Sequence, residues 1–254
     1  MLESRWAYTA TMIVATLVAG LLVRRAGGGA AGRSISVTPT QRMGIIIGGL
    51  AGAMFAAKIP FVLSTDTPEG VISAWLGDGK TILWGLAGGY VGVEVGKWAT
   101  WVRGSTGDQF VVALAVGIAV GRVGCLMFGC CYGVETDLAW GIRFPAAVDL
   151  GTVTRHPTQI YEMSFHSAFA VVAWRGIRRG DIPTCWMPLY LVAYSIYRFS
   201  SEFVRPEPRL AAGLTFYQWS SIVIGAAFLV ILVVRLRKLP FDPPREPFSV
   251  ADPH

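Results

Sequence analysis

The sequence is poor in charged side chains. Asp, Glu, Lys and Arg make up 15% of its 254 residues, whereas an ordinary soluble domain carries about 25%. Hydrophobic residues reach 53% and the mean hydropathy is +0.51, so disorder and a collagen-like chain are excluded. Four cysteines are too few for a disulfide-rich secreted scaffold. A chain with so little polar surface is typical of an integral membrane protein.

Acidic residues are fewer than basic ones, which gives a formal net charge of +6 and a pI near 9.4. A basic chain suggests nucleic acid as a partner, but the cytoplasmic loops of membrane proteins carry the same excess of Lys and Arg. We therefore expect no nucleic-acid partner and assign the excess charge to loops.

Long apolar runs predict seven membrane-spanning helices, because a helix needs about 20 mostly apolar residues to cross the hydrocarbon. The third and fifth runs are the weakest. The predicted spans are 7–23, 43–63, 81–96, 110–132, 160–174, 186–203 and 217–234. The expected fold class is therefore an all-α integral membrane protein, with one transmembrane domain over 1–239 and a short cytoplasmic tail over 240–254.

Positive charge predicts the orientation. Arg24 and Arg25 follow the first span, which favours an uncleaved anchor with its N-terminus outside. Seven spans then leave 13 of the 22 Lys and Arg residues inside, six outside and three within or at the edge of spans. The six outer cations are Arg5, Lys80, Arg143, Arg155, Arg205 and Arg209. This asymmetry places the C-terminus in the cytoplasm.

Arg122 and Arg198 fall inside predicted spans. An arginine at the centre of a span costs roughly 2.5–3.5 kcal/mol on insertion scales and is rarely kept without a role. Gly121 and Gly124 flank Arg122 and allow a lipid headgroup or another backbone to approach the helix. Two arginines that converge from different helices would match the oxygens of a phosphate group. We therefore predict a clamp for a phospholipid headgroup.

Tyr194, Arg198 and Glu202 lie four residues apart and share one helix face. The alternative to a headgroup clamp is an internal Arg198–Glu202 pair that only neutralises itself.

A dense polar run opens the fifth predicted span. It combines a cation, an imidazole, an amide, a phenol and a carboxylate, which are Arg155, His156, Gln159, Tyr161 and Glu162. Histidine transfers protons near neutral pH, and its neighbours would orient it. The alternative is that the run only begins a helix whose first turn is solvated.

Four ordered blocks resemble the bacterial prolipoprotein diacylglyceryl transferases, and together they cover the last three-fifths of the chain. The blocks are 121–133 (including Gly133), 155–162, 194–206 (including Arg205) and 214–219. The resemblance implies an inner-membrane enzyme with seven spans and its N-terminus outside. Such an enzyme moves the diacylglyceryl group of phosphatidylglycerol to a lipoprotein-signal cysteine and releases glycerol phosphate.

The resemblance also implies residue roles. Arg122 and Arg198 would hold the phosphate, Glu202 would orient Arg198, and Tyr194 would lie by the headgroup. The residues expected to line the outer mouth are Arg155, His156, Gln159, Tyr161 and Glu162. No metal or nucleotide cofactor is implied, and the expected partners are an anionic phospholipid and a lipoprotein precursor peptide.

The chain departs from the family pattern at several positions. Cys125, Phe128 and Cys130 replace two asparagines and a glutamate, and Ala87 aligns with the histidine that is often assigned a proton-accepting role. The enzyme would then use another base, such as His156, or run a different reaction on the same scaffold.

Cys125, Cys130 and Cys131 form a cluster in the sequence. A thiol near Arg122 with a lowered pKa would serve as a covalent nucleophile or an acceptor. Packing as small buried hydrophobes, the commonest fate of free cysteine, is another interpretation, and a disulfide is a further one. The spacing does not match a zinc finger, so no metal is predicted.

The leading hypothesis is a transferase that moves a diacylglyceryl group to a prolipoprotein thiol. The alternative is that the protein is a divergent member of the family, which acts on a different lipid or transfers to a different acceptor. Such a transfer could pass through a cysteine of the enzyme. Two alternatives of another class are a headgroup-binding carrier or transporter and a membrane thiol-redox protein.

Overall fold

A computed structural model describes residues 2–26, 37–63, 68–77, 81–144 and 152–239. These ranges are helical apart from connecting segments, with three isolated β-bridges and no strand. The tail expected at 240–254 lies outside the described residues. The described chain therefore confirms the all-α expectation.

Each predicted span coincides with a long helix in the described residues. These helices are α1 (Leu2–Ala26), α2 (Pro39–Leu63), α4 (Ile82–Ala99), α5 (Gly107–Phe128), α6 (Thr158–Arg179), α7 (Trp186–Ser201) and α8 (Phe216–Arg237). Of these, α2, α5 and α8 are long and apolar enough to cross a membrane by length and composition. The chain thus has the helices of a membrane protein, while the count of seven crossings and the orientation stay predictions.

Short elements and helix ends differ from the sequence expectation. The short helix α3 (Pro68–Leu76) and two 3₁₀ turns, η1 (Glu202–Val204) and η2 (Ala211–Gly213), were not predicted. The fourth span was expected to reach residue 132, but α5 ends at Phe128 because Gly129 adopts a left-handed conformation with φ 75°. The end of α5 is therefore followed by a turned segment that carries two of the cysteines.

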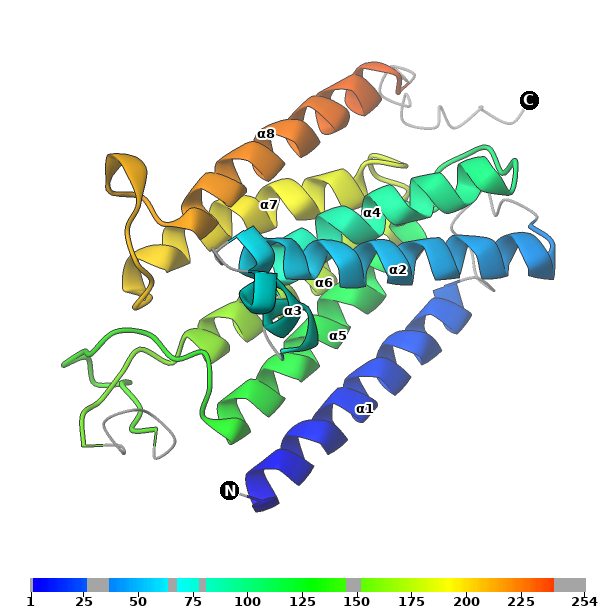
Figure 1. The fold of residues 1–254 in the computed structure, drawn as a ribbon. Coiled ribbons are helices and arrows are strands. Elements are labelled where there is room, and N and C mark those ends of the chain that lie inside the picture. The colour runs from blue at the N-terminus through cyan, green and yellow to red at the C-terminus, as the bar shows by residue number, and fades with distance from the viewer. Residues whose placement is uncertain (1, 27–36, 64–67, 78–80, 145–151, 240–254) are drawn as a thin grey trace, which may run out of the picture.

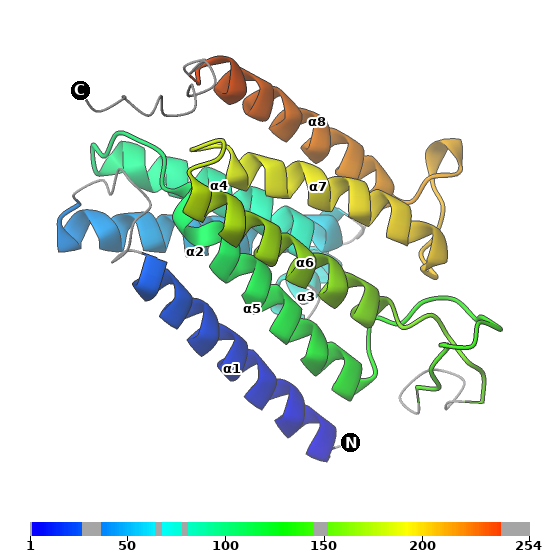
Figure 2. The same cartoon turned by 180° about the vertical axis from the view of Figure 1, so that it is seen from behind.

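The helices pack in neighbouring pairs: α2 on α4, α1 on α5, α5 on α6, and α7 on α8. Figure 1 shows the start of α1 at the same end of the bundle as the segments that follow α5 and α7, and the end of α8 at the opposite end. Figure 2 shows the same arrangement from behind. The segments that carry the sequence-predicted site residues therefore meet at one end.

Helix α7 forms the centre of the apolar core. Its Tyr190, Leu191 and Tyr194 are almost fully buried, and they pack in one cluster with Val111 of α5 and Ala173 of α6. At the other side of the bundle, α2 and α4 approach so closely that a Cβ added to a facing glycine would clash with backbone of the other helix. This close packing fixes the helices from which the buried polar side chains project.

Candidate functional site

Glu162 lies at the centre of a buried ionic network. Its Oε2 accepts from Arg122 at 2.6 Å and from Arg205 at 3.3 Å, and its Oε1 accepts from the Tyr194 hydroxyl at 2.5 Å. Glu162 is 0% exposed, so this carboxylate depends on protein donors rather than on water. The network joins α5, α6, α7 and the segment after α7.

Helical spacing places Glu162 on the buried face of α6. Gln159, Glu162, His166, Ala170 and Ala173 are all buried and recur at intervals of three or four residues. The same face thus changes from polar at the start of the helix to apolar further along. This pattern places the polar network beside the start of α6, at one end of the bundle, and the apolar core further along the helix.

Arg198 and Glu202 form a second ion pair, with 2.9 Å between Nη2 and Oε2. The Arg198 guanidinium also lies over the Tyr217 ring at 4.9 Å. Glu202 accepts a further hydrogen bond from the Thr215 hydroxyl at 3.2 Å, and Thr215 caps the start of α8. The internal pair expected from the four-residue spacing is therefore present, and aromatic and hydroxyl groups from α8 and its cap hold it.

The structure links the two arginine systems indirectly. Among the described contacts, none joins Arg122 to Arg198. Tyr194 lies one turn before Arg198 on α7, and its hydroxyl donates to the carboxylate that pairs with Arg122. Tyr194 therefore connects the two predicted phosphate ligands, to Arg122 through Glu162 and to Arg198 along α7.

Three arginines in this region keep unsatisfied donors. Within the described residues, Arg122 Nε, Arg198 Nη1 and Arg205 Nε are buried and have no hydrogen-bond partner. Buried donors in proteins are nearly always paired. Three guanidinium groups with spare N–H donors are suited to bind an additional anion with several oxygens.

The segment between α5 and α6 folds back on itself. Gly133 donates to the His156 carbonyl at 2.8 Å, and a Cβ added to Gly133 would lie 2.5 Å from the Val204 carbonyl oxygen. Gly133 thus permits close contact between this segment and the one that follows α7. Gly121 and Gly124 are both buried, and the nearest neighbour of a Cβ added to Gly121 would be Met12 of α1.

Half-buried polar residues surround the buried network. The His156 Nδ1 lies 3.2 Å from the Tyr161 hydroxyl, and that hydroxyl accepts from Trp140 at 2.8 Å. Arg155 pairs with Glu135 at 3.5 Å. Arg155, His156 and Tyr161 are each partly buried, and their place at an outer mouth stays a prediction.

Gln159 and Glu162 are placed differently from the expectation for the outer mouth. They are 1% and 0% exposed, so neither lies on an accessible rim. The Gln159 amide donates to the Cys130 carbonyl at 2.6 Å, and the Thr158 hydroxyl donates to the Cys131 carbonyl. The start of α6 therefore anchors the cysteine segment, because a buried amide and hydroxyl need acceptors.

The three clustered cysteines lie beside Arg122. Its Nη1 is 3.9 Å from Cys125 Sγ, and the sulfur atoms of Cys125, Cys130 and Cys131 lie within 4.8 Å of one another. Hydrogen bonds from Cys125 and Cys130 lower the pKa of Cys131, and nearby Arg122 and Arg205 lower it further. Cys131 is the exposed member of the cluster, whereas Cys125 is buried and Cys130 is partly buried.

Sequence reasoning gave His166 no role, yet the structure places it in the network. Its Nδ1 lies 2.8 Å from the Tyr190 hydroxyl, and its Nε2 lies 3.8 Å from Glu162 Oε1. The four-residue step from Glu162 to His166 was the available signal. No sequence pattern pointed to Tyr190, because an aromatic residue in an apolar helix reads as core.

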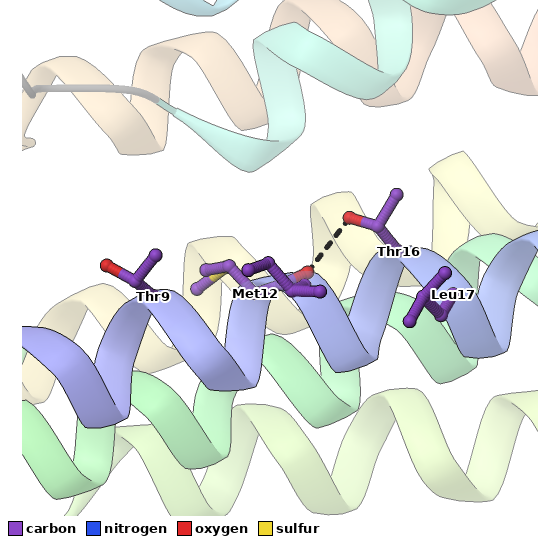
Figure 3. Close-up of a pocket in the computed structure, with 5 residues that line it drawn as sticks. Thr9, Met12, Thr16 and Leu17 are labelled. Atoms are coloured by element: carbon purple, nitrogen blue, oxygen red, sulfur yellow. Dashed lines mark hydrogen bonds between the residues drawn. The ribbon is translucent and has the colours of Figure 1, made fainter.

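Two pockets have linings that include no residue of the ionic network. One, of about 300 Å³, lies on α1 and is lined by Thr9, Met12, Ile13, Thr16 and Leu17 (Figure 3). The Thr16 hydroxyl there donates to its own helix at the Met12 carbonyl, 2.9 Å away. This lining carries no charge, so the pocket does not suit an anionic headgroup.

The second pocket, of about 350 Å³, lies between α2, α4 and α5. Most of its lining is apolar and includes Ile45, Leu50, Ile82, Phe110, Leu114 and Ile118. Ile118 precedes Arg122 by one helical turn. The apolar pocket thus extends along α5 toward the arginine network.

The fold and the site define an all-helical membrane protein with a buried arginine–carboxylate network. The chain belongs to the prolipoprotein diacylglyceryl transferase family, whose sequence model matches residues 2–234. It is 29% identical to the phosphatidylglycerol–prolipoprotein diacylglyceryl transferase of Cupriavidus necator, over 78% of this chain and 73% of that protein.

Other relatives carry the same name. The chain is 33% identical to the phosphatidylglycerol–prolipoprotein diacylglyceryl transferase 2 of Clostridium perfringens, over 66% of this chain and 67% of that protein. It is 31% identical to the corresponding protein of Geobacter sulfurreducens, over 84% of this chain and 82% of that protein. The family expected from the four sequence blocks is therefore confirmed.

Proposed function

We propose that this protein transfers the diacylglyceryl group of phosphatidylglycerol to the cysteine thiol of a prolipoprotein. Membership of the family and the names of its relatives support this reaction. The observation that carries it in this chain is the group of three buried arginines with unpartnered N–H donors. Ionisable residues kept inside a membrane protein mark functional sites, and guanidinium N–H donors without a partner suit the oxygens of a phosphate.

The proposal includes seven membrane crossings in the bacterial inner membrane, with the N-terminus outside and the C-terminus in the cytoplasm. The distribution of Lys and Arg along the sequence supports this orientation. Figure 1 shows the start of α1 at the same end of the bundle as the ends of α5 and α7. Arg122 and Arg198 lie near those two ends, so an N-terminus outside would put them at the outer surface. The reaction would then occur at the outer surface.

The chemistry explains why cations are needed. The acceptor sulfur bonds to the glyceryl carbon that carries the phosphate ester, and the carbon–oxygen bond breaks with its electron pair on oxygen. The leaving glycerol phosphate carries one more negative charge than the phosphodiester did. Arg122 and Arg198 would stabilise this developing charge, because preorganised donors act most strongly where charge appears.

The acceptor thiol must lose a proton before or during attack. His156 is the base that we assign, because it is partly accessible and the Tyr161 hydroxyl orients its ring. The Ala87 position, which aligns with the family histidine, packs against the apolar core. Ala87 offers no proton acceptor, so the base has to come from elsewhere in this chain.

The apolar pocket along α5 would take part of an acyl chain of the donor. Its end lies one turn from Arg122, so a lipid whose phosphate is held at the arginines would lay its tail along Ile118 and Leu114. A pocket of about 350 Å³ holds only part of a diacylglycerol, so the rest of the tails would contact the bilayer.

A covalent enzyme intermediate on a cysteine is disfavoured by the product chemistry. Attack by an enzyme thiolate on the glyceryl carbon would form a thioether, and an alkyl thiolate is a poor leaving group from such a bond. The enzyme would then be consumed in one turnover. Direct transfer to the acceptor thiol avoids this dead end.

The test is a reconstituted assay. Purified protein in phosphatidylglycerol vesicles receives a peptide with a lipoprotein-signal cysteine, and released glycerol phosphate and peptide mass are measured. We expect a diacylglyceryl mass gain that falls about 10²–10³-fold in Arg122→Ala and in Arg198→Ala. Arg143→Ala is the matched control, because Arg143 is exposed in the segment after α5, and it should keep the wild-type rate.

The other outcomes identify the rival functions. Glycerol phosphate without peptide modification would point to another acceptor. Neither product from folded, lipid-bound protein would contradict the transferase assignment and favour a carrier. Loss of function in Cys130→Ser or Cys131→Ser together with tolerance of Arg122→Ala would favour a thiol-redox protein.

A further inference from the structure

The end of α5 folds so that three sulfur atoms meet. Gly129 takes a left-handed conformation, and the backbone N–H of Cys130 donates to the Cys125 carbonyl at 3.1 Å. This turn returns the chain toward the last turn of α5. As a result, Cys125, Cys130 and Cys131 lie with their sulfur atoms within 4.8 Å of one another.

The cysteine segment is held in place from a second helix. Gln159 and Thr158 of α6 donate to the carbonyls of Cys130 and Cys131. Cys131 itself adopts φ 63°, a conformation that a residue with a side chain takes only when its surroundings impose it. The positions of the three sulfur atoms are therefore fixed by the fold and not by the sequence spacing alone.

We propose that Cys125, Cys130 and Cys131 bind a thiophilic d¹⁰ cation, zinc(II) or copper(I). Thiolate ligands select such soft or borderline ions over magnesium and calcium. A zinc–sulfur bond of about 2.3 Å sets bound sulfur atoms about 3.8–4.0 Å apart, so sulfur atoms now within 4.8 Å need shifts of only about 1 Å. Short side-chain rotations supply such shifts.

The surroundings suit a cation held by three thiolates. Three thiolates and zinc(II) carry a single net negative charge, and the Arg122 guanidinium lies 3.9 Å from Cys125 Sγ. In the described part of the chain, no histidine or carboxylate joins this group. Cys131 is exposed, which leaves one side of the ion open to water or to an incoming thiol.

Simple packing does not explain the cluster. Buried cysteines often act as small hydrophobes, but Cys131 is exposed and Cys130 is only partly buried. The sequence spacing argued against zinc because it matches no zinc finger. The chain reversal at Gly129 brings the sulfur atoms together, and spacing along the sequence does not show such a reversal.

The test is metal binding to the full-length protein, which needs no transferase activity. Reduced, metal-free protein in micelles competes anaerobically with a chromophoric chelator for zinc(II), and in a parallel titration for copper(I). We expect one equivalent of at least one ion per chain. Cys131→Ser should weaken binding by more than the roughly 10–100-fold that loss of an outer-shell partner costs.

Cys185→Ser is the matched control. Cys185 is a free, buried cysteine at the start of α7, and it packs near the beginning of α5 rather than its end. It should bind the ion as tightly as wild type. Cys125 lies 3.9 Å from Arg122, a residue of the proposed anion site, so the exposed Cys131 carries the test instead.

Two results would overturn the proposal. The first is equal metal retention by wild type and Cys131→Ser. The second is a wild-type protein that retains neither ion. This result counts against the proposal when all four thiols titrate as reduced, and it also does so when two of them titrate as oxidised, which would indicate a disulfide. A cobalt(II)-loaded sample adds a direct readout, because thiolate-to-cobalt charge-transfer absorption should weaken in Cys131→Ser and persist in Cys185→Ser.

Discussion

Replacement of Glu162 by Gln should expose how strongly this protein depends on one buried carboxylate. The change keeps the shape of the side chain and removes its charge. Arg122 and Arg205, whose side chains are 11% and 10% exposed, would then lack their anion. Loss of one partner from a buried ionic network costs about 3–5 kcal/mol, so we expect the free energy of unfolding to fall by that amount.

Glu135→Gln is the matched control. Glu135 also pairs with an arginine, Arg155, at 3.5 Å, but its side chain is 66% exposed. Exposed pairs contribute about 0–1 kcal/mol, so the control should unfold near the wild-type midpoint. Reversible denaturation in mixed micelles, followed by circular dichroism, measures both variants against wild type.

The lipid dependence of the same measurement tests the anion site. If a phosphate occupies the arginine network, phosphatidylglycerol should stabilise Glu162→Gln more than wild type, because the lipid supplies the missing negative charge. At a lipid concentration of 100 times Kd the gain is about 2.7 kcal/mol, and neutral phosphatidylcholine should give less. Equal losses of unfolding free energy in Glu162→Gln and Glu135→Gln would refute the role of Glu162 as a buried counter-ion. Equal stabilisation by phosphatidylglycerol and phosphatidylcholine would refute an anion site at the arginines.

Three further predictions concern the segments around the site. Gly133→Ala should cost about 1–3 kcal/mol, because its Cβ would lie 2.5 Å from the Val204 carbonyl oxygen. Gly20→Ala in α1, with nothing within 4 Å, should unfold at or above the wild-type midpoint, because alanine is favoured over glycine inside a helix. A Gly133→Ala midpoint equal to that of wild type would contradict this. His156→Asn should lower kcat about 10²–10⁴-fold, and higher pH should recover part of the loss by supplying acceptor thiolate without a base; a wild-type rate would remove His156 as the base. In a cysteine-free background, Arg209→Cys should react with a membrane-impermeant thiol reagent added to intact spheroplasts. A C-terminal tag should stay protected from external protease. The reverse pattern would contradict the predicted orientation, with the N-terminus outside and the C-terminus in the cytoplasm.

The sequence by itself determined the features that depend on neighbouring residues. Apolar runs located the seven long helices of the described chain, because hydrophobicity is a local property of a segment. The Arg198–Glu202 pair followed from a four-residue step on one helix. Four ordered blocks were sufficient to identify the family, since the order of motifs along a chain is visible without a fold.

Helix ends were harder to predict than helix positions. The sequence extended the fourth span through the cysteines, whereas Gly129 ends α5 before Cys130. A glycine in an apolar run is compatible with either a continued helix or a left-handed end. Contacts from Thr158 and Gln159 of α6 select the second conformation, and these contacts do not exist until the helices pack.

Tertiary structure decided which charged groups from separate segments of the chain meet. Glu162 was expected at the outer mouth, but packing buries it and pairs it with Arg122 and Arg205, which lie 40 and 43 residues away along the chain. The three cysteines likewise form a cluster only when the chain reverses after α5. Ion pairs and a cluster of thiols both need atoms from separate segments within a few ångströms of one another, and distances of that size are set by how the helices pack.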